Sequence, residues 1–140
     1  REVALLGQDA SKLGILLRGR PHQSHLRVVM VEAAAQAWAA LKKTQDLLAA
    51  TSVSIIKTDA LHYLRHTTEK FDLVFLDPPY ASALLPDALI LLRQCLREGA
   101  RVYCEAGNKL NFVGWEVVRA GRVGNVNYGL LCDAQREAEA

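Results

Sequence analysis

Short apolar runs alternate along this chain with amphipathic or alanine-rich segments, and an acidic residue follows three of the runs, either immediately or after one further residue. The runs are Leu26–Val31, Val53–Lys57 and Phe71–Leu76, and the acids that follow them are Glu32, Asp59 and Asp77. Nearly continuous apolar runs of this length are typical of parallel strands covered on both faces. The pattern predicts an α/β fold, a Rossmann-like doubly wound and mostly parallel sheet, with the three acids gathered at its carboxyl edge.

The rest of the chain completes this plan as a single domain over residues 1–140. Further strands are expected at Val3–Leu6 (closed by Gly7), Arg101–Glu105, Trp115–Arg119 and Val126–Leu131. Helices are expected over residues 11–20, 33–50, 60–64 and 83–96, the last of them stopped by Glu98–Gly99. A turn through Gly121 and Gly124 joins the last two strands into an antiparallel hairpin at the sheet edge. The polar tail 133–140 is expected to fray.

Composition excludes several classes of protein. With 51% hydrophobic residues in 140, a disordered chain is excluded, and a net charge of +2 permits a nucleic-acid partner without requiring one. The cysteines, Cys95, Cys104 and Cys132, have no metal-ligand spacing, so no metal site is expected. No apolar run is long enough to span a membrane and no signal peptide is evident. We expect a cytoplasmic monomer.

The segment Asp77-Pro78-Pro79-Tyr80 carries the most specific chemistry. The lone pair of an amino group on an aromatic base is delocalised into the ring, so methylation requires acceptors for both amino hydrogens. Asp77 offers a carboxylate and Pro78 a backbone carbonyl, and two successive prolines hold the backbone rigid. Tyr80 offers a ring on which a base stacks. This motif predicts methyl transfer to an exocyclic amine; the alternative is a rigid turn after the strand.

The other two acids have one functional and one structural interpretation each. Glu32, at the end of the second strand, suits the hydroxyls of a ribose, or else caps the helix that follows. Asp59 suits an adenine amino group, with the backbone N–H of Ala60 beside it, or else it is the N-cap of the next helix. These residues, with Gly7 at the end of the first strand, form the expected cofactor-binding set.

On these motifs the chain resembles the RsmD-type bacterial 16S ribosomal RNA guanine-N2 methyltransferases, which have a class I methyltransferase fold. The resemblance runs from about Val28 to about Leu131 and includes Thr58–Leu61 and Phe71–Tyr80. It implies S-adenosyl-L-methionine as methyl donor and a guanine of 16S rRNA, in a partly assembled small ribosomal subunit, as substrate. It also implies that Asp77, Pro78, Pro79 and Tyr80 form the catalytic motif, with Glu32 on the ribose and Asp59 on the adenine.

The N-terminal stretch departs from the pattern of that family. A glycine-rich loop normally follows the first strand, whereas residues 3–14 here keep only Gly7 and Gly14 as glycines. We also expect the usual arm rich in Arg and Thr to be missing before this strand. Weak donor binding is therefore one expectation from the sequence, because the glycine pair lets backbone approach the cofactor.

Three other functions compete with this interpretation. A DNA adenine-N6 or cytosine-N4 methyltransferase uses the same kind of Asp-Pro-Pro-aromatic motif, usually with an added recognition domain. A catalytically inactive methyltransferase fold that serves as a binding module would keep the sheet without the glycine loop. A nicotinamide-dependent oxidoreductase is disfavoured, because no G-x-G-x-x-G follows the first strand.

Overall fold

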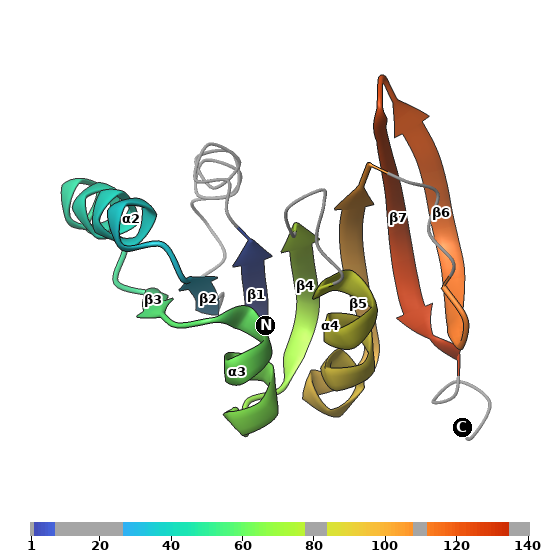
Figure 1. The fold of residues 1–140 in the computed structure, drawn as a ribbon. Coiled ribbons are helices and arrows are strands. Elements are labelled where there is room, and N and C mark those ends of the chain that lie inside the picture. Colours follow the sequence, from blue (N-terminus) through green and yellow to red (C-terminus); the bar gives the residue numbers. More distant parts are fainter. Residues whose placement is uncertain (1, 8–26, 78–83, 108–111, 135–140) are drawn as a thin grey trace.

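A seven-stranded sheet organises the chain (Figure 1). The structure is a computed structural model and describes residues 2–7, 27–77, 84–107 and 112–134. Its strands are β1 (Glu2–Gly7), β2 (Arg27–Glu32), β3 (Val53–Lys57), β4 (Phe71–Asp77), β5 (Leu96–Ala106), β6 (Trp115–Val123) and β7 (Val126–Asp133). Their spatial order is β3-β2-β1-β4-β5-β7-β6, with β7 antiparallel to its neighbours and the other pairings of β1 to β5 parallel. The predicted doubly wound sheet with a C-terminal hairpin is confirmed.

Helices cover the two faces of this sheet unequally. The helices are α2 (Ala35–Leu48), α3 (Ala60–His66) and α4 (Leu84–Leu92), and the 3-10 turn η1 (Arg93–Cys95) follows α4. In Figure 1, α3 and α4 lie on one face, where the larger core joins them to β2, β4, β5 and β7. A smaller core, Val28, Met30, Leu41 and Val53, packs under α2 on the other face. No described helix is long and apolar enough to cross a membrane.

The α2 helix also covers the outer edge of β3, the last strand on that side of the sheet. Trp38 donates its Nε1–H to the carbonyl of Ile55 at 3.3 Å, and Gln45 Nε2 donates to the carbonyls of Val53 at 2.5 Å and Ala50 at 3.2 Å. Unpaired strand edges are templates for pairing with another chain. Side chains from α2 therefore occupy carbonyls that would otherwise attract a foreign strand.

Gln45→Leu is expected to lower the free energy of unfolding by about 1–3 kcal/mol and to promote self-association. The variant keeps the side chain's size and loses the two hydrogen bonds to the carbonyls of Ala50 and Val53, each worth roughly 0.5–1.5 kcal/mol. It also loses a longer contact at 3.4 Å from Lys42 Nζ, which is partly exposed and contributes little. Urea denaturation and light scattering measure the two effects. Gln36→Leu, an exposed position of the same helix, is the matched control. Equal stabilities for the two variants would contradict the edge-protection role.

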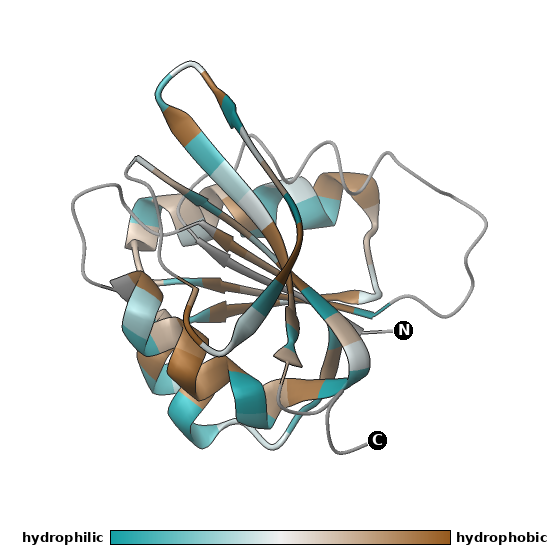
Figure 2. Cartoon of the chain, turned by 90° about the vertical axis from the view of Figure 1, so that its right-hand side faces the viewer, coloured by the Kyte–Doolittle hydropathy of each residue, from teal (hydrophilic) through white to brown (hydrophobic). Residues whose placement is uncertain are grey.

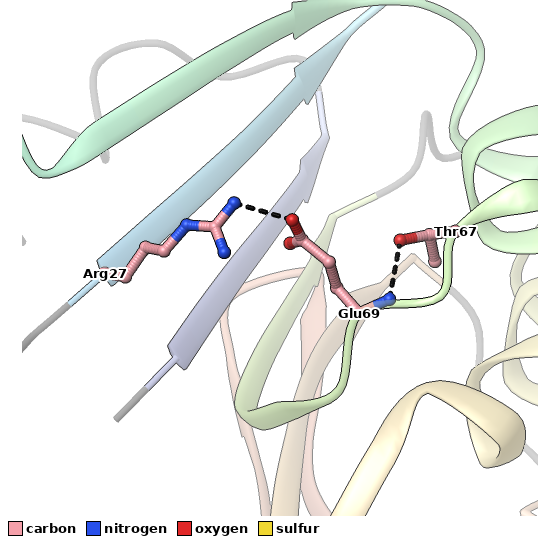
Figure 3. Close-up of polar contacts among 3 residues, drawn as sticks. All are labelled: Arg27, Thr67 and Glu69. Carbon is pink, nitrogen blue, oxygen red and sulfur yellow. Dashed lines mark hydrogen bonds and ion pairs between the residues drawn. The ribbon is translucent and has the colours of Figure 1, made fainter.

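An ion pair fastens the opposite, amino-terminal edge of the sheet (Figure 3). Arg27, the first residue of β2, donates to Glu69 Oε1 at 2.6 Å, and the backbone N–H of Glu69 donates to Thr67 Oγ1 at 3.1 Å. Glu69 lies in the connection between α3 and β4. The pair is partly exposed, so its contribution to stability is at most about 1 kcal/mol. Its role is to fix where the chain enters β4.

The β6–β7 hairpin projects beyond the helix-covered part of the sheet, mixing hydrophilic and hydrophobic residues (Figure 2). Its base is held by Arg93 of η1. That guanidinium donates to the carbonyl of Gly114 at 2.7 Å, lies 5.1 Å from the ring centre of Trp115 and is 3.8 Å from the carboxylate of Asp133. Asp133 is buried as the last residue of β7. The predicted frayed tail is therefore wrong for Asp133, while residues 135–140 lie outside the described structure.

Several boundaries differ from the sequence-based expectation, including those of the helix expected over 33–50, which spans Ala35–Leu48, and of the strand expected over Trp115–Arg119, which extends to Val123. The expected helix over 83–96 ends at Leu92, and β5 begins at Leu96, which pairs with Phe71. The expected stop at Glu98–Gly99 is instead an irregularity inside β5, where Gly99 has a φ of +76° and the register with β4 shifts. The helix expected over 60–64 is longer, and the one expected over 11–20 lies outside the described residues.

The hairpin turn also differs from the expectation. Gly124, with a φ of +59°, forms it together with Asn125, whereas Gly121 lies within β6. A side chain at position 121 would collide with the phenol of Tyr128, its partner on β7. Gly121 is therefore required for close packing across the strands rather than for a turn.

Stability is expected to fall between pH 9 and about 12 through Cys104. Burial raises the pKa of this fully buried thiol from 9.0 to about 12, so it ionises in the unfolded chain first. The stabilising contribution is complete below pH 9 and is lost as pH rises through 12, by up to about 4 kcal/mol. Cys104→Ala should flatten the fall measured by urea denaturation at several pH values. An unchanged slope would contradict this assignment.

Candidate active site at the carboxyl edge of the sheet

The strand order reverses between β1 and β4, and this reversal indicates where a ligand-binding site is expected. From β1 the chain proceeds outward to β2 and β3 on one side, and from β4 to β5 on the other. Gly7 and Asp77, the last residues of β1 and β4, are paired in the register across this point. In open α/β sheets ligands bind beyond the carboxyl ends of the strands at such a reversal. Asp77 is thus the strand-end acid nearest to it.

Glu32 ends β2, the other neighbour of β1. Leu6 pairs with Val31, so Glu32 follows on β2 next to Gly7. Glu32 is only 3% exposed, which rules out the solvated cap that its sequence position allowed. Its Oε1 accepts the backbone N–H of Ala34 at 3.0 Å. No hydrogen bond from the described part of the chain reaches its Oε2, so this oxygen can accept from a ligand.

Asp59 lies two residues beyond the end of β3 and begins α3. Its Oδ2 accepts the backbone N–H of His62 at 3.1 Å, so the structural alternative, an N-cap, is present. Ala60 is the first residue of α3, and the N–H groups of a helix's first turn have no intrahelical acceptor. The N-cap bond uses one carboxylate oxygen, so it is compatible with a second acceptor role for Asp59.

The catalytic motif expected from the sequence is described only in part. The backbone of Asp77 is the end of β4, whereas Pro78, Pro79 and Tyr80, and the side chain of Asp77, lie outside the described structure. The described backbone brings Gly7, Glu32 and Asp77 together as the final residues of three adjacent strands. Asp59 follows the next strand along the same edge.

Glu105 is a further acid at this edge that the sequence analysis treated only as part of a strand. Leu76 pairs with Cys104, so Glu105 on β5 is beside Asp77 on β4. The hydroxyl of Tyr103 donates to Glu105 Oε1 at 2.9 Å. The sequence pattern that indicated Glu32, Asp59 and Asp77, an acid at the end of an apolar strand, also indicates Glu105.

Three aromatic rings form a row across β4, β5 and β7 beside Glu105. Phe75 of β4 lies 5.8 Å from Tyr103 of β5, and Tyr103 stacks on Tyr128 of β7 at 6.3 Å with an angle of 22° between the rings. Tyr128 is paired with Glu105 in the antiparallel register. Such contacts fix the orientation of the rings. The hydroxyl that Tyr103 donates to Glu105 is therefore held in a fixed position. All of these side chains are partly exposed.

No group of three or more His, Cys, Asp or Glu side chains within the described residues is arranged to hold a metal ion. His62 and His66 of α3 stack on each other with ring centres 4.2 Å apart, and His66 Nδ1 contacts the carbonyl of His62. Their proximity is therefore a helical i, i+4 contact.

Comparison with known proteins assigns the chain to a family. The model of the family described as Conserved hypothetical protein 95 matches residues 23–132. The chain belongs to this family. It is also 29% identical over 97 residues to Ribosomal RNA small subunit methyltransferase D of Buchnera aphidicola subsp. Baizongia pistaciae. That match covers 64% of this chain, and the chain spans about half the length of that relative. The predicted resemblance to RsmD-type proteins is confirmed.

Solved structures confirm the fold of this Conserved hypothetical protein 95 member. A putative methyltransferase, yhhF, from Escherichia coli superposes with a TM-score of 0.80 at 22% identity, covering 93% of this chain and 73% of that one. A putative methylase, HI0767, from Haemophilus influenzae superposes with a TM-score of 0.78 at 25% identity, covering 94% and 86%. The chain therefore has the class I methyltransferase fold predicted from its sequence.

Proposed function

We propose that the chain transfers a methyl group from S-adenosyl-L-methionine to the exocyclic amino group, N2, of a guanine in 16S rRNA. The observation that carries the proposal is the placement of Gly7, Glu32 and Asp77 as final residues of adjacent strands at the reversal of strand order. The name of the Buchnera relative, an rRNA methyltransferase, supports the same substrate class. The proposed setting is a partly assembled small ribosomal subunit in the cytoplasm, with the chain acting as a monomer.

The residues beside β1 fit the methyl donor. S-adenosyl-L-methionine supplies an electrophilic methyl group on a sulfonium. Glu32 has a buried carboxylate with one oxygen that no described group uses, which suits the two ribose hydroxyls. Asp59 and the first N–H of α3, at Ala60, suit the amino group and a ring nitrogen of adenine. Gly7, without a side chain, leaves the end of β1 open to a ligand.

The end of β4 is proposed to hold the base that is methylated. Asp77 accepts one hydrogen of the guanine amino group, and the carbonyl of Pro78 accepts the other, so that the nitrogen lone pair is directed at the methyl group. Positive charge develops on this nitrogen during transfer, and the Asp77 carboxylate stabilises it. As the new N–C bond forms, the S–C bond of the donor would break and its electron pair would stay on sulfur. The nitrogen then gives one of its two protons to the Asp77 carboxylate, which passes it to water. Pro79 keeps the backbone rigid, and Tyr80 stacks on the base.

Transfer of tritiated methyl groups tests this proposal directly. The full chain is incubated with labelled donor and with 30S particles, naked 16S rRNA or DNA in parallel, and the product is digested to nucleosides. The expected product is N2-methylguanosine from rRNA or particles. N6-methyladenine or N4-methylcytosine in DNA would replace the proposed substrate. Calorimetry with the donor tests the remaining alternative. A chain that neither binds the donor nor transfers a methyl group to any acceptor is an inactive binding module.

A further inference from the structure

We propose that Glu105 accepts the N1–H of the target guanine and thereby selects guanine over adenine and cytosine. This inference rests on the proposed function, since it concerns the base whose amino group the Asp77 motif receives. It adds a specificity-determining residue on β5 to a motif that, by itself, is equally suited to any amino-bearing base. The argument depends on position, on fixation of the carboxylate and on the hydrogen-bonding pattern of the bases.

The position of Glu105 follows from the strand register. Leu76 of β4 pairs with Cys104 of β5, so Asp77 and Glu105 are the next residues on two adjacent parallel strands. Such strands lie about 4.8 Å apart. Groups anchored on neighbouring strands at this spacing reach adjacent atoms of one base, and N1 of guanine is two bonds from the N2 amino nitrogen. Asp77 and Glu105 therefore suit neighbouring donors of a single guanine.

The carboxylate of Glu105 is held in place by Tyr103. The phenol donates to Oε1 at 2.9 Å, and its ring is packed between Phe75 and Tyr128. A carboxylate has about four lone-pair positions, so a carboxylate that accepts from a phenol can accept from a base as well. Fixing the acceptor before the base arrives reduces the entropy lost on binding. The side chain of Glu105 is partly exposed.

The bases differ at the ring nitrogen beside the amino group. In guanine N1 carries a hydrogen and is a donor. N1 of adenine and N3 of cytosine carry a lone pair instead of a hydrogen. An ionised carboxylate repels this lone pair, and the ring nitrogen is left without a hydrogen-bond partner. A site built to accept a hydrogen bond rejects an analogue that lacks the donor. Glu105 therefore favours guanine against both DNA substrates that the Asp-Pro-Pro-Tyr motif alone leaves open.

The test compares guanosine with 2-aminopurine, which keeps the 2-amino group and has an unprotonated N1. Two RNA fragments are synthesised around the position that the chain methylates, one with each base, and kcat/KM is measured for both. The parent chain should prefer guanosine by about 100-fold. Glu105→Gln presents an amide that donates to N1 of 2-aminopurine, so the preference should fall below about tenfold. Glu98→Gln, an exposed position of the same strand, should keep the parent's preference.

Tyr103→Phe provides a second variant if Glu105→Gln fails to fold. It keeps the aromatic row and removes the hydroxyl that holds Glu105, so the preference for guanosine should fall by about three- to tenfold. Equal use of the two bases by the parent, or an unchanged preference in Glu105→Gln and Tyr103→Phe, overturns the inference while guanine methylation stands. Absence of methyl transfer by the parent to any acceptor instead refutes the proposed function.

Discussion

Asp77→Ala is expected to lower methyl transfer to RNA by about 100- to 1,000-fold while donor affinity stays nearly unchanged. The magnitude is that of removing one group placed where charge develops in a transition state. Asp77 ends β4, on the other side of β1 from Glu32 at the end of β2 and from Asp59, which follows β3. Its loss should therefore weaken the positioning of the amino group of the base. It should leave the binding of the ribose and adenine of the donor unchanged. Initial rates with labelled donor and calorimetry measure the two quantities separately.

Asp87→Ala is the matched control for this variant. Asp87 is exposed in the first turn of α4, so its removal makes the same change of charge close in sequence without touching the edge of the sheet. We expect its rate to stay within about twofold of the parent. If Asp77→Ala keeps a rate within about tenfold of the parent, Asp77 is not the acceptor of the amino hydrogens.

The parallel part of the fold was predictable because its signals are local. Val53–Lys57 is a strand with the bounds that its apolar run suggested, and Glu32 and Asp77 end strands where the sequence placed them. Parallel strands that alternate with helices share one carboxyl edge, so the proximity of these acids followed from the order of elements alone. The common edge of the candidate site residues could thus be predicted from the sequence, while their roles stay predictions.

Features that depend on long-range pairing were not predictable. Leu92 and Leu96 fit one helical stripe, yet Leu96 leaves the helix because it pairs with Phe71, which lies 25 positions earlier in the sequence. Gly121 and Gly124 are equally good turn residues locally. Only the packing of Tyr128 over position 121 shows which of them the turn uses. Local propensity gives way in both cases to contacts between distant strands.

The candidate site also combines a feature that is predictable from local sequence with one that depends on strand pairing. Glu105 has the same sequence signature as Glu32, an acid at the end of an apolar strand, but its relation to the base depends on strand register. The register places it beside Asp77 and opposite Tyr128, and neither neighbour is close in sequence. A residue that selects between bases acts through such neighbours, so its role emerges only when the strands are assembled.

Glu32→Ala is expected to weaken binding of S-adenosyl-L-methionine by about 100-fold or more. Hydrogen bonds to a charged group are worth roughly 1.5–3 kcal/mol each, and two ribose hydroxyls are proposed to donate to this carboxylate. The parent's affinity is itself expected to be modest, since only Gly7 and Gly14 remain as glycines in residues 3–14. Calorimetry with S-adenosylhomocysteine, which carries the same ribose, measures the loss without turnover.

Glu32 also accepts the N–H of Ala34, so its removal affects folding as well as binding. Losing that hydrogen bond costs about 0.5–1.5 kcal/mol, since Ala34 is exposed and water replaces the lost acceptor, and urea denaturation of Glu32→Ala will show this cost. Glu32→Gln separates the two effects, because its amide oxygen still accepts from Ala34 while the negative charge is gone. We expect Glu32→Gln to fold like the parent and to bind S-adenosylhomocysteine about tenfold more weakly. Parent-like affinity in both variants would mean that the ribose lies elsewhere along the edge.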